Sequence, residues 1–214
     1  MTVQPPIRIE NALGVCTVRE DTRLLAELAG DGPTPAGRAL DLGTGSGYVA
    51  IYLARHGWDV DAVDISPRAL ELARRNAELN GVAPCIYASN MFDSVNGPYD
   101  VVACNPPQRS NETEGSRLIT ATLRRLPSLS NMVLRLTQPM LERKRLGFLA
   151  ELARGARPHL TAGGRLLLVI SPLEAAELPK LAPGLRTAGS AQVNAIPGLS
   201  VVTFVYEKIA DGNR

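Results

Sequence analysis

A glycine-rich turn between an apolar run and a helical pattern constrains the fold of this chain more than any other feature. The turn reads DLGTGSG over residues 41–47, after the apolar run 38–42 and before the helical periodicity of 48–54. A parallel α/β sheet binds nucleotide-like ligands at such a turn, because the first strand ends there and a helix begins. The turn therefore predicts an α/β fold with a ligand site at the carboxyl end of that strand.

Strand and helix patterns alternate along the rest of the chain. Further strands are predicted at 58–63, 84–88, 99–104 and 165–170, helices at 67–79 and 142–160, and two last strands between 191 and 208, around Pro197-Gly198. Ser66 is placed to cap the helix at 67–79, with Pro67 at its first position. We expect a doubly wound, Rossmann-like α/β sheet of seven mostly parallel strands, with an antiparallel C-terminal hairpin at its edge.

The N-terminal residues are predicted to form a helical flap on the same domain. A helix is expected through residues 24–28, with Asp21 or Thr22 as its cap and Gly30 at its end. The linker at 31–37 is rich in Gly and Pro but too short to separate two domains. We therefore assign residues 1–37 to the flap and residues 38–214 to the main domain.

Composition and charge exclude several classes of protein. The net charge of +2 gives no overall reason to expect nucleic-acid or membrane binding, and a hydrophobic share of 45% is typical of a globular domain. Three cysteines without metal-ligand spacing indicate neither a disulfide framework nor a metal site. No run has the length of a membrane span or the apolar core of a signal peptide. We expect a cytoplasmic enzyme-like domain without a metal.

Three details of the glycine turn specify its ligand. A dinucleotide fingerprint requires its third glycine where Tyr48 stands, so the spacing differs from that of NAD sites. Asp41 would repel a pyrophosphate but accepts hydrogen bonds from a cationic ligand. Asp64 ends the second predicted strand, where a carboxylate accepts from both ribose hydroxyls. A ribose without pyrophosphate, beside an acid and bare backbone, describes S-adenosylmethionine.

These residues resemble the class I S-adenosylmethionine-dependent methyltransferases. The resemblance covers residues 38–170, with the family's first motif at 41–47 and its ribose-binding acid at Asp64. It implies that the residues after the third strand border the adenine and that Ile65 packs on the adenine face. For Met91, ordinary core packing remains the alternative. The expected cofactor contacts are Thr22, Asp41, Gly43, Thr44, Gly45, Gly47, Asp64, Ile65, Asn90, Met91 and Asn105.

The tetrapeptide Asn105-Pro106-Pro107-Gln108 directly follows the strand predicted at 99–104. Two prolines remove two backbone donors and keep the chain extended, so the Asn105 side-chain oxygen and the Pro106 carbonyl form a rigid pair of acceptors. Such a pair binds both hydrogens of a planar amino group and aims its nitrogen at a sulfonium methyl. We expect these four residues to form the catalytic turn. A plain strand-ending turn is the alternative.

This turn resembles the (Asn/Asp)-Pro-Pro-aromatic signature of the amino-methyltransferase branch, and most of all the HemK-type glutamine N5-methyltransferases. Residues 19–25 are similar to that family's N-terminal motif, which implies that Thr22 lies near the methionine end of the cofactor. The chain departs from the family at Gln108, where an aromatic residue is usual. Because Gln108 cannot stack on a base, a protein glutamine or a small amide or guanidino metabolite ranks first as acceptor, and an RNA or DNA base second.

Other residues bear on the acceptor and on partners. Glu112 and Glu114 would pair with a cationic substrate, although solvated loop acids are the commoner case. Basic residues are concentrated between 116 and 165, and such a stretch either holds RNA or an acidic partner or forms a solvated helix face. Interleaved leucines face the core or cover a homodimer surface. A scaffold without activity would predict a decayed cofactor turn, which this sequence does not have.

Overall fold

The structure is a computed structural model that describes residues 5–31, 37–107 and 127–207, with only the backbone for 127–141. The strands are β1 (Arg38–Leu42), β2 (Asp59–Asp64), β3 (Cys85–Ala88), β4 (Tyr99–Cys104), β5 (Leu160–Ile170), β6 (Leu185–Gln192) and β7 (Ser200–Tyr206). The helices are α1 (Glu20–Gly30), α2 (Tyr48–Arg55), α3 (Pro67–Leu79), α5 (Pro127–Ala156) and α6 (Pro172–Leu181), with a 3-10 turn at Arg157–His159.

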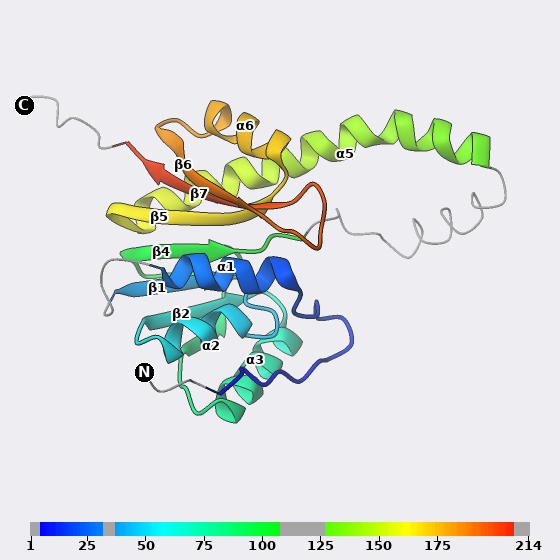
Figure 1. Cartoon of the computed structure of the whole chain (residues 1–214). Helices are drawn as coiled ribbons and strands as arrows, with labels where there is room; N and C mark the ends of the chain where they lie inside the picture. Colours follow the sequence, from blue (N-terminus) through cyan, green and yellow to red (C-terminus); the bar gives the residue numbers. More distant parts are fainter. Residues whose placement is uncertain (1–4, 32–36, 108–126, 208–214) are drawn as a thin grey trace, which may run out of the picture.

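All the described strands belong to one seven-stranded sheet, in the order β3-β2-β1-β4-β5-β7-β6. The strands from β1 to β5 pair in parallel, and β7 runs antiparallel to both of its neighbours, β5 and β6. The strand order reverses between β1 and β4, which is the switch point where open α/β sheets bind ligands. The predicted doubly wound fold with a C-terminal antiparallel hairpin is confirmed (Figure 1).

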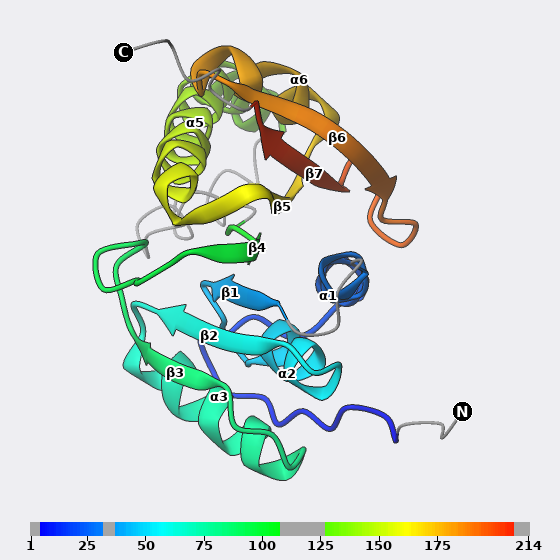
Figure 2. The same ribbon diagram turned by 90° about the vertical axis from the view of Figure 1, so that its left-hand side faces the viewer.

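Helices cover both faces of the sheet, and the alternation of side chains along each strand supplies both cores. On β4, Val101 and Ala103 pack toward α1 and α2, whereas Val102 and Cys104 pack toward α5 and α6. Figure 2 shows α1 and α2 on one side of the sheet and α5 on the other. A strand buried on both faces reads as a continuous apolar run, which is why β4 was predictable to the residue.

Several elements differ from the sequence-based expectation. The helix α5 begins at Pro127, well before residue 142, and its N-terminal half extends beyond the sheet (Figure 1). The strand β5 begins at Leu160, before the predicted start at 165, and runs through Gly163-Gly164. A register shift opposite Tyr99–Val101 accommodates these glycines. The edge strand β6 starts at Leu185, earlier than 191, and α6 was not expected.

The physical reason for these misses is weak local patterning. The residues of β6 are mostly exposed and few are β-branched, because an edge strand needs little apolar surface. The helix α6 contains Pro179, which argues against a helix in a single sequence. By contrast, α3 has its expected bounds, and its cap is confirmed by the bond from Ala69 N to Ser66 Oγ at 3.4 Å.

The N-terminal segment lies along α3 and is held there by two asparagines. Arg8 and Asn80 exchange bonds, with Arg8 N donating to Asn80 Oδ1 at 3.0 Å and Asn80 Nδ2 donating to Arg8 O at 2.7 Å. Asn76 is fully buried and accepts from Glu10 N at 2.8 Å while its Nδ2 donates to Ser46 O at 2.8 Å. Asn76 therefore connects the N-terminal segment, α3 and the glycine turn.

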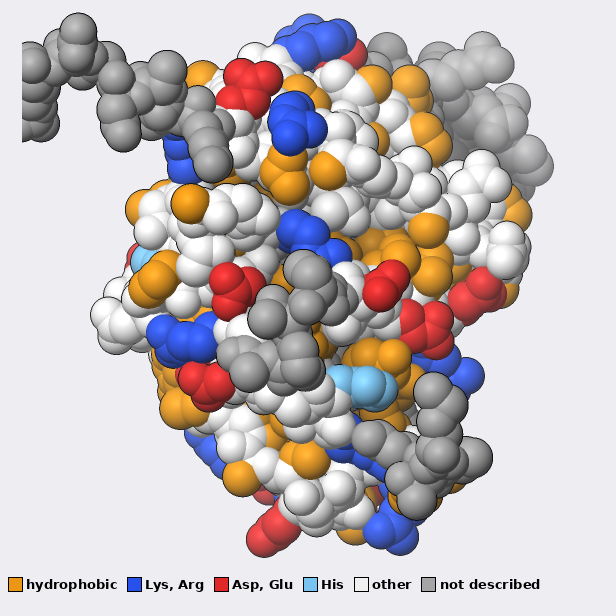
Figure 3. Space-filling model, turned by 60° about the vertical axis from the view of Figure 1, so that its left-hand side comes forward, with side chains coloured by type: hydrophobic (Ala, Val, Ile, Leu, Met, Phe, Trp, Pro, Cys, Tyr) orange, Lys and Arg blue, Asp and Glu red, His pale blue; other side chains and the backbone are white. Residues whose placement is uncertain are grey.

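On the face of the molecule that Figure 3 shows, neither sign of charge forms a separate patch. Figure 3 shows basic and acidic side chains interspersed over one face of the molecule, in agreement with a net charge of +2. Within the described ranges, no helix combines the length and apolarity needed to cross a lipid bilayer.

Gly47 should be essential to the seating of the turn on α3. It has φ +83°, and a Cβ there would lie 3.0 Å from the Ala73 Cβ and 3.1 Å from the Ala73 Cα. Backbone strain and overpacking together should lower the free energy of unfolding of Gly47→Ala by about 2–5 kcal/mol, measured by urea denaturation. The control is Gly81→Ala, which has φ +67° but open space around its Cβ. It should lose only about 1–2 kcal/mol. Equal losses would contradict the steric argument.

Candidate active site

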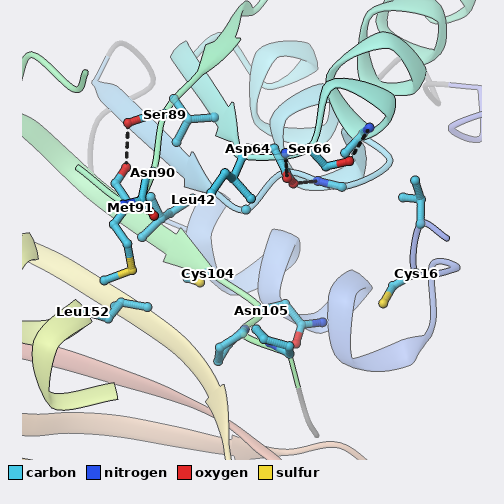
Figure 4. A pocket seen from close by; sticks show the side chains of 18 of the residues that line it. Cys16, Leu42, Asp64, Ser66, Ser89, Asn90, Met91, Cys104, Asn105 and Leu152 are labelled. Atoms are coloured by element: carbon cyan, nitrogen blue, oxygen red, sulfur yellow. Dashed lines mark hydrogen bonds between the residues drawn. The ribbon is translucent and has the colours of Figure 1, made fainter. Parts of the chain in front are cut away.

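A cavity of about 400 Å³ lies at the carboxyl ends of β1, β2 and β4 (Figure 4). Its volume falls in the range of small-molecule sites. Among the predicted site residues, its lining includes Gly43, Gly45, Asp64, Ile65, Asn90, Met91, Asn105, Pro106 and Pro107. The cavity thus brings together the predicted cofactor turn and the predicted catalytic turn, which are about 60 residues apart in the sequence.

The glycine turn wraps over the end of β2. Gly43 N and Thr44 N both donate to the Val63 carbonyl, at 2.8 and 2.9 Å. Gly43 has φ +76° and a Cβ there would meet nothing within 4 Å, so this backbone faces open space. Gly45, at φ +55°, is similarly unobstructed, with Val15 Cγ1 the nearest atom at 3.8 Å. Glycine allows both the positive φ and the close approach of a ligand to the backbone.

Asp41 lies beneath the turn and outside the cavity lining. It is 2% exposed, and its Oδ2 accepts from Thr44 Oγ1 at 2.7 Å and from Ala50 N at 3.1 Å. Burial raises the pKa of Asp41 from 3.8 to about 6, against the lowering effect of these two hydrogen bonds. In this arrangement Asp41 fastens the turn to the start of α2. Thr44 and Gly47 belong to the same buried support and also lie outside the lining.

Asp64 borders the cavity at the end of β2. Its Oδ2 accepts from Gly45 N at 3.0 Å and its Oδ1 from Ser66 N at 2.9 Å, so backbone donors from both sides orient the carboxylate. Each oxygen has a further lone pair for a ligand. The next residue, Ile65, is 70% exposed on the cavity wall. An exposed isoleucine beside an oriented carboxylate suits an apolar ring joined to a polyol.

The segment after β3 forms the part of the wall beside Asp64, where Ser89 N donates to Asp64 O at 3.2 Å. Asn90 and Met91 both line the cavity, and Met91 has φ +49°, which is unusual for a residue other than glycine. Ser89 stabilises this conformation, because its Oγ donates to Met91 O at 2.9 Å and accepts from Ser94 N at 3.0 Å (Figure 4). Met91 also packs partly against the core, so it lies both in the cavity wall and at the edge of the core.

Asn105 is oriented by α1. Its Nδ2 donates to Asp21 Oδ2 at 3.3 Å and to Thr22 Oγ1 at 3.1 Å. A carboxylate only accepts, so the amide must present its nitrogen to Asp21 and its oxygen must point away from that carboxylate. Because Asn105 borders the cavity, the position of its amide is defined relative to any ligand there.

Asp21 and Thr22 do not cap α1, contrary to the sequence-based expectation. The helix starts at Glu20 after Arg19, which has no side-chain cap bond. Asp21 is 2% exposed inside the first turn, where it accepts from Arg19 Nη2 at 3.2 Å as well as from Asn105. Thr22 reaches Asn105 and not the cavity lining. The helix begins before Asp21, so this residue stands inside the first turn, where its Oδ1 accepts from Thr22 N at 3.0 Å and its Oδ2 is left for Asn105 and Arg19.

Sequence reasoning missed several other residues of the site. Gly14, Val15 and Cys16 from the N-terminal segment and Phe148 and Leu152 from α5 line the cavity. Asp21 was missed as the partner of Asn105. The signal that the sequence offered for Asp21 was an acidic residue at the start of an amphipathic helix. The apolar α5 residues gave none, because they are indistinguishable from core positions in the sequence.

Some predicted residues lie outside the described ones. These are Gln108, Glu112 and Glu114, together with the side chains of the first part of the basic stretch, up to residue 141. In the described part of that stretch, Arg165 donates to the Leu28 and Ala29 carbonyls at 3.3 and 3.2 Å, and Arg157 donates to Pro183 O at 3.3 Å. Arg143 and Lys144 are exposed. Part of the basic stretch therefore has a structural role.

Cys104 lines the cavity with a buried thiol. Burial raises the pKa of the Cys104 thiol, and the charges of Asp41 and Asp64 raise it further, so the thiol stays neutral. Over the described ranges, no group of three or more His, Cys, Asp or Glu side chains is placed to hold a metal ion.

The arrangement of the sheet and its covering helices is shared with solved methyltransferases. The ribosomal protein L11 methylase of Lactobacillus delbrueckii subsp. bulgaricus superimposes with a TM-score of 0.67 over 94% of this chain and 85% of that chain, at 18% sequence identity. At that identity the likeness shows a common fold.

The sequence comparisons define the family. Residues 17–134 match the family model of the methyltransferase small domain, so the chain belongs to that family. A release factor glutamine methyltransferase of Deinococcus radiodurans is 35% identical over 154 residues, covering 71% of this chain and 51% of that protein. A ribosomal RNA small subunit methyltransferase C of Alcanivorax borkumensis is 33% identical over 101 residues, covering 46% and 31%. The chain thus spans about half or less of these relatives.

The raised pKa of Asp41 predicts a pH-dependent stability. The folded protein holds a proton on Asp41 up to about pH 6, whereas the unfolded chain releases it near 3.8. Ionisation of Asp41 therefore destabilises the fold as the pH rises through this window. At about 1.4 kcal/mol per pKa unit, Asp41→Asn should gain about 3 kcal/mol relative to the wild type between about pH 3.5 and about pH 7, measured by urea denaturation.

The control for this measurement is Asp59→Asn. Asp59 is the first residue of β2, the strand that pairs with β1, and its side chain is 73% exposed. The free energy of unfolding of Asp59→Asn, relative to the wild type, should not show the gain with rising pH that is expected for Asp41→Asn. A constant difference for Asp41→Asn would show that folding does not raise the pKa of this carboxyl.

Proposed function

We propose that this chain transfers a methyl group from S-adenosylmethionine to a planar conjugated nitrogen, with the side-chain amide of a protein glutamine as the first-ranked acceptor. A small amide or guanidino metabolite belongs to the same class. The observation that carries the proposal is one cavity bordered both by Asp64 and the glycine turn and by Asn105 and Pro106.

The described lining of the cavity suits this cofactor better than a phosphate-bearing one. It contains the carboxylate of Asp64 but no lysine or arginine among its described residues. A pyrophosphate would leave its charge without a basic partner, whereas S-adenosylmethionine is cationic at its sulfonium and ammonium groups. We assign Asp64 to the ribose, Ile65, Asn90 and Met91 to the adenine, and the backbone of Gly43 and Gly45 to the remainder.

The catalytic turn would act through orientation. The Asn105 oxygen and the Pro106 carbonyl each accept one hydrogen of the acceptor's amino group, which localises the nitrogen lone pair and directs it at the methyl carbon. The carbon–sulfur bond breaks as the new carbon–nitrogen bond forms, and the proton leaves afterwards. Among the described residues, none donates to the Pro106 carbonyl. We propose that Gln108 contacts the acceptor beside this pair.

The amino group of a nucleic-acid base is the second candidate. Its support is the similarity to a small subunit ribosomal RNA methyltransferase and the exposed Arg143 and Lys144 on α5. Its obstacle is Gln108, which offers no aromatic face for a base. The glutamine acceptor is supported by the longer match, to a release factor glutamine methyltransferase. A cytoplasmic location and a flap function for residues 1–37 are parts of the same proposal.

Asp64 should dominate cofactor affinity. Replacing it by Ala should weaken S-adenosylmethionine binding about tenfold or more, because a hydrogen bond to a charged group contributes about 1.5–3 kcal/mol. Asp64→Asn keeps one acceptor and should lose less. Titration calorimetry measures both variants, and Asp59→Ala, at the opposite end of β2, is the matched control. An affinity unchanged in Asp64→Ala would sink the cofactor assignment.

Asn105 should matter for transfer and not for cofactor affinity. Asn105→Ala should lower turnover about 100- to 1000-fold, as loss of one preorganised polar group does in other enzymes, with an S-adenosylmethionine Kd within about twofold of the wild type. The assay follows radiolabelled methyl transfer to a bacterial release factor, to small subunit ribosomal RNA and to free glutamine. Asn96→Ala, before the start of β4, is the control. Full activity of Asn105→Ala would exclude the orienting mechanism, and label in RNA alone would favour the second candidate.

A further inference from the structure

Backbone hydrogen bonds alone cannot hold the Asn105-Pro106-Pro107 turn in place. Its two prolines carry no N–H, so the sheet ladder ends with Cys104 and residues 106–107 can be held only through their carbonyls and packing. A pair of acceptors aimed at an amino group must nevertheless keep its geometry within a fraction of an ångström. Other groups must therefore hold the turn.

Arg145 supplies the missing hydrogen bond. Its Nη1 donates to the Pro107 carbonyl and its Nε donates to Glu174 Oε1. The side chains of Arg145 and Glu174 are only 14% and 13% exposed, so this pair is shielded from water. Two acceptors at a fixed angle match the planar fork of a guanidinium, which an ammonium cannot reproduce.

Glu174 is itself immobilised at the start of α6. Its Oε2 accepts from Ser171 N at 2.8 Å, and its own N donates to Ser171 Oγ at 3.3 Å, which forms a capping box. Ser171 directly follows β5, and β5 pairs with β4 up to Cys104↔Leu168. The contacts therefore close a ring from β4 through the turn, Arg145, Glu174 and Ser171 to β5 and back to β4.

The opposite side of the turn is held independently. Asp21 and Thr22 on α1 accept from the Asn105 amide nitrogen, as described above. The turn is thus held at Asn105 from one face of the sheet and at Pro107 from the other. The Pro106 carbonyl lies between these two attachments, which is the position of the second proposed acceptor.

We propose that Arg145, seated by Glu174, is a positioning residue that holds the Asn105-Pro106-Pro107 turn in the geometry required for methyl transfer. Neither side chain lines the cavity, so neither is expected to contact the cofactor. The kinetic part of this inference rests on the proposed function, whereas the structural part does not. If the ion pair only stabilised the fold, its removal would lower stability and cofactor affinity together. If it positions the turn, its removal lowers kcat and leaves cofactor affinity unchanged.

The test compares Arg145→Met, Arg145→Lys and Glu174→Gln with two controls. Lys144→Met removes an exposed charge from the neighbouring position of α5, and Lys180→Met removes an exposed charge from α6 that pairs with Glu177, so both leave the Arg145–Glu174 pair and the cap of α6 intact. Methyl transfer to the acceptor labelled by the wild type gives kcat and KM, calorimetry gives the S-adenosylmethionine Kd, and thermal unfolding reports stability.

Arg145→Met should lower kcat about tenfold or more, while the S-adenosylmethionine Kd and the acceptor KM stay within about twofold of the wild type. Arg145→Lys and Glu174→Gln should fall between Arg145→Met and the wild type, and both controls should keep the wild-type kcat. A kcat unchanged in Arg145→Met overturns the proposal. So does a loss of kcat matched by an equal loss of cofactor affinity.

A second measurement needs no acceptor. In protein labelled with carbon-13 proline, the NMR signals of Pro106 and Pro107, which have no exchangeable amide, should broaden in Arg145→Met and Arg145→Lys relative to the wild type, Lys144→Met and Lys180→Met. If the wild type neither binds S-adenosylmethionine nor transfers methyl groups, the proposed function fails while this measurement still tests the attachment. Unchanged Pro106 and Pro107 signals in both Arg145 variants overturn the positioning role on their own.

Discussion

The attachment of the glycine turn by two carboxylates underlies the rest of the site. Asp41 holds the turn to the first turn of α2, and Asp64 holds Gly45 from the end of β2. A carboxylate that is 2% exposed, as Asp41 is, destabilises its charged form, and its raised pKa expresses this cost. The hydrogen bonds from Thr44 and Ala50 offset part of it. These bonds hold a turn whose backbone faces the cavity without an obstructing side chain.

The second turn of the site, Asn105-Pro106-Pro107, is held in place in a different way. The glycine turn is flexible by composition and needs buried acceptors to order it. The Asn-Pro-Pro turn is stiff by composition but has no backbone donor at either proline, and side chains from α1 and α5 hold it at Asn105 and Pro107. In both turns the groups that line the cavity are attached to elements fixed by the sheet. The two turns meet because β1 and β4 are neighbours at the point where the strand order reverses.

The elements that could be predicted are those with strong local patterns. β1, α3 and β4 have the expected bounds because their apolar periodicity and the Ser66 cap are local features. β6 and α6 were missed because an exposed edge strand and a short helix with an internal proline carry little signal. In the site, Asp64, Asn105 and Pro106 were predictable from motif and position. Asp21 and Arg145 were not, because their roles depend on partners 84 and 38 residues away.

The sequence by itself determined the α/β order of elements, the glycine turn after β1 and the Asn-Pro-Pro turn after β4, since each depends on residues adjacent in the chain. Only the tertiary structure decided which groups hold these turns. It assigned Asp41 to support beneath the glycine turn, brought Asp21 from α1 to Asn105, and placed Arg145 between Pro107 and Glu174. The physical reason is that a hydrogen bond requires two groups within about 3 Å, and chain folding alone sets that distance for residues far apart in sequence.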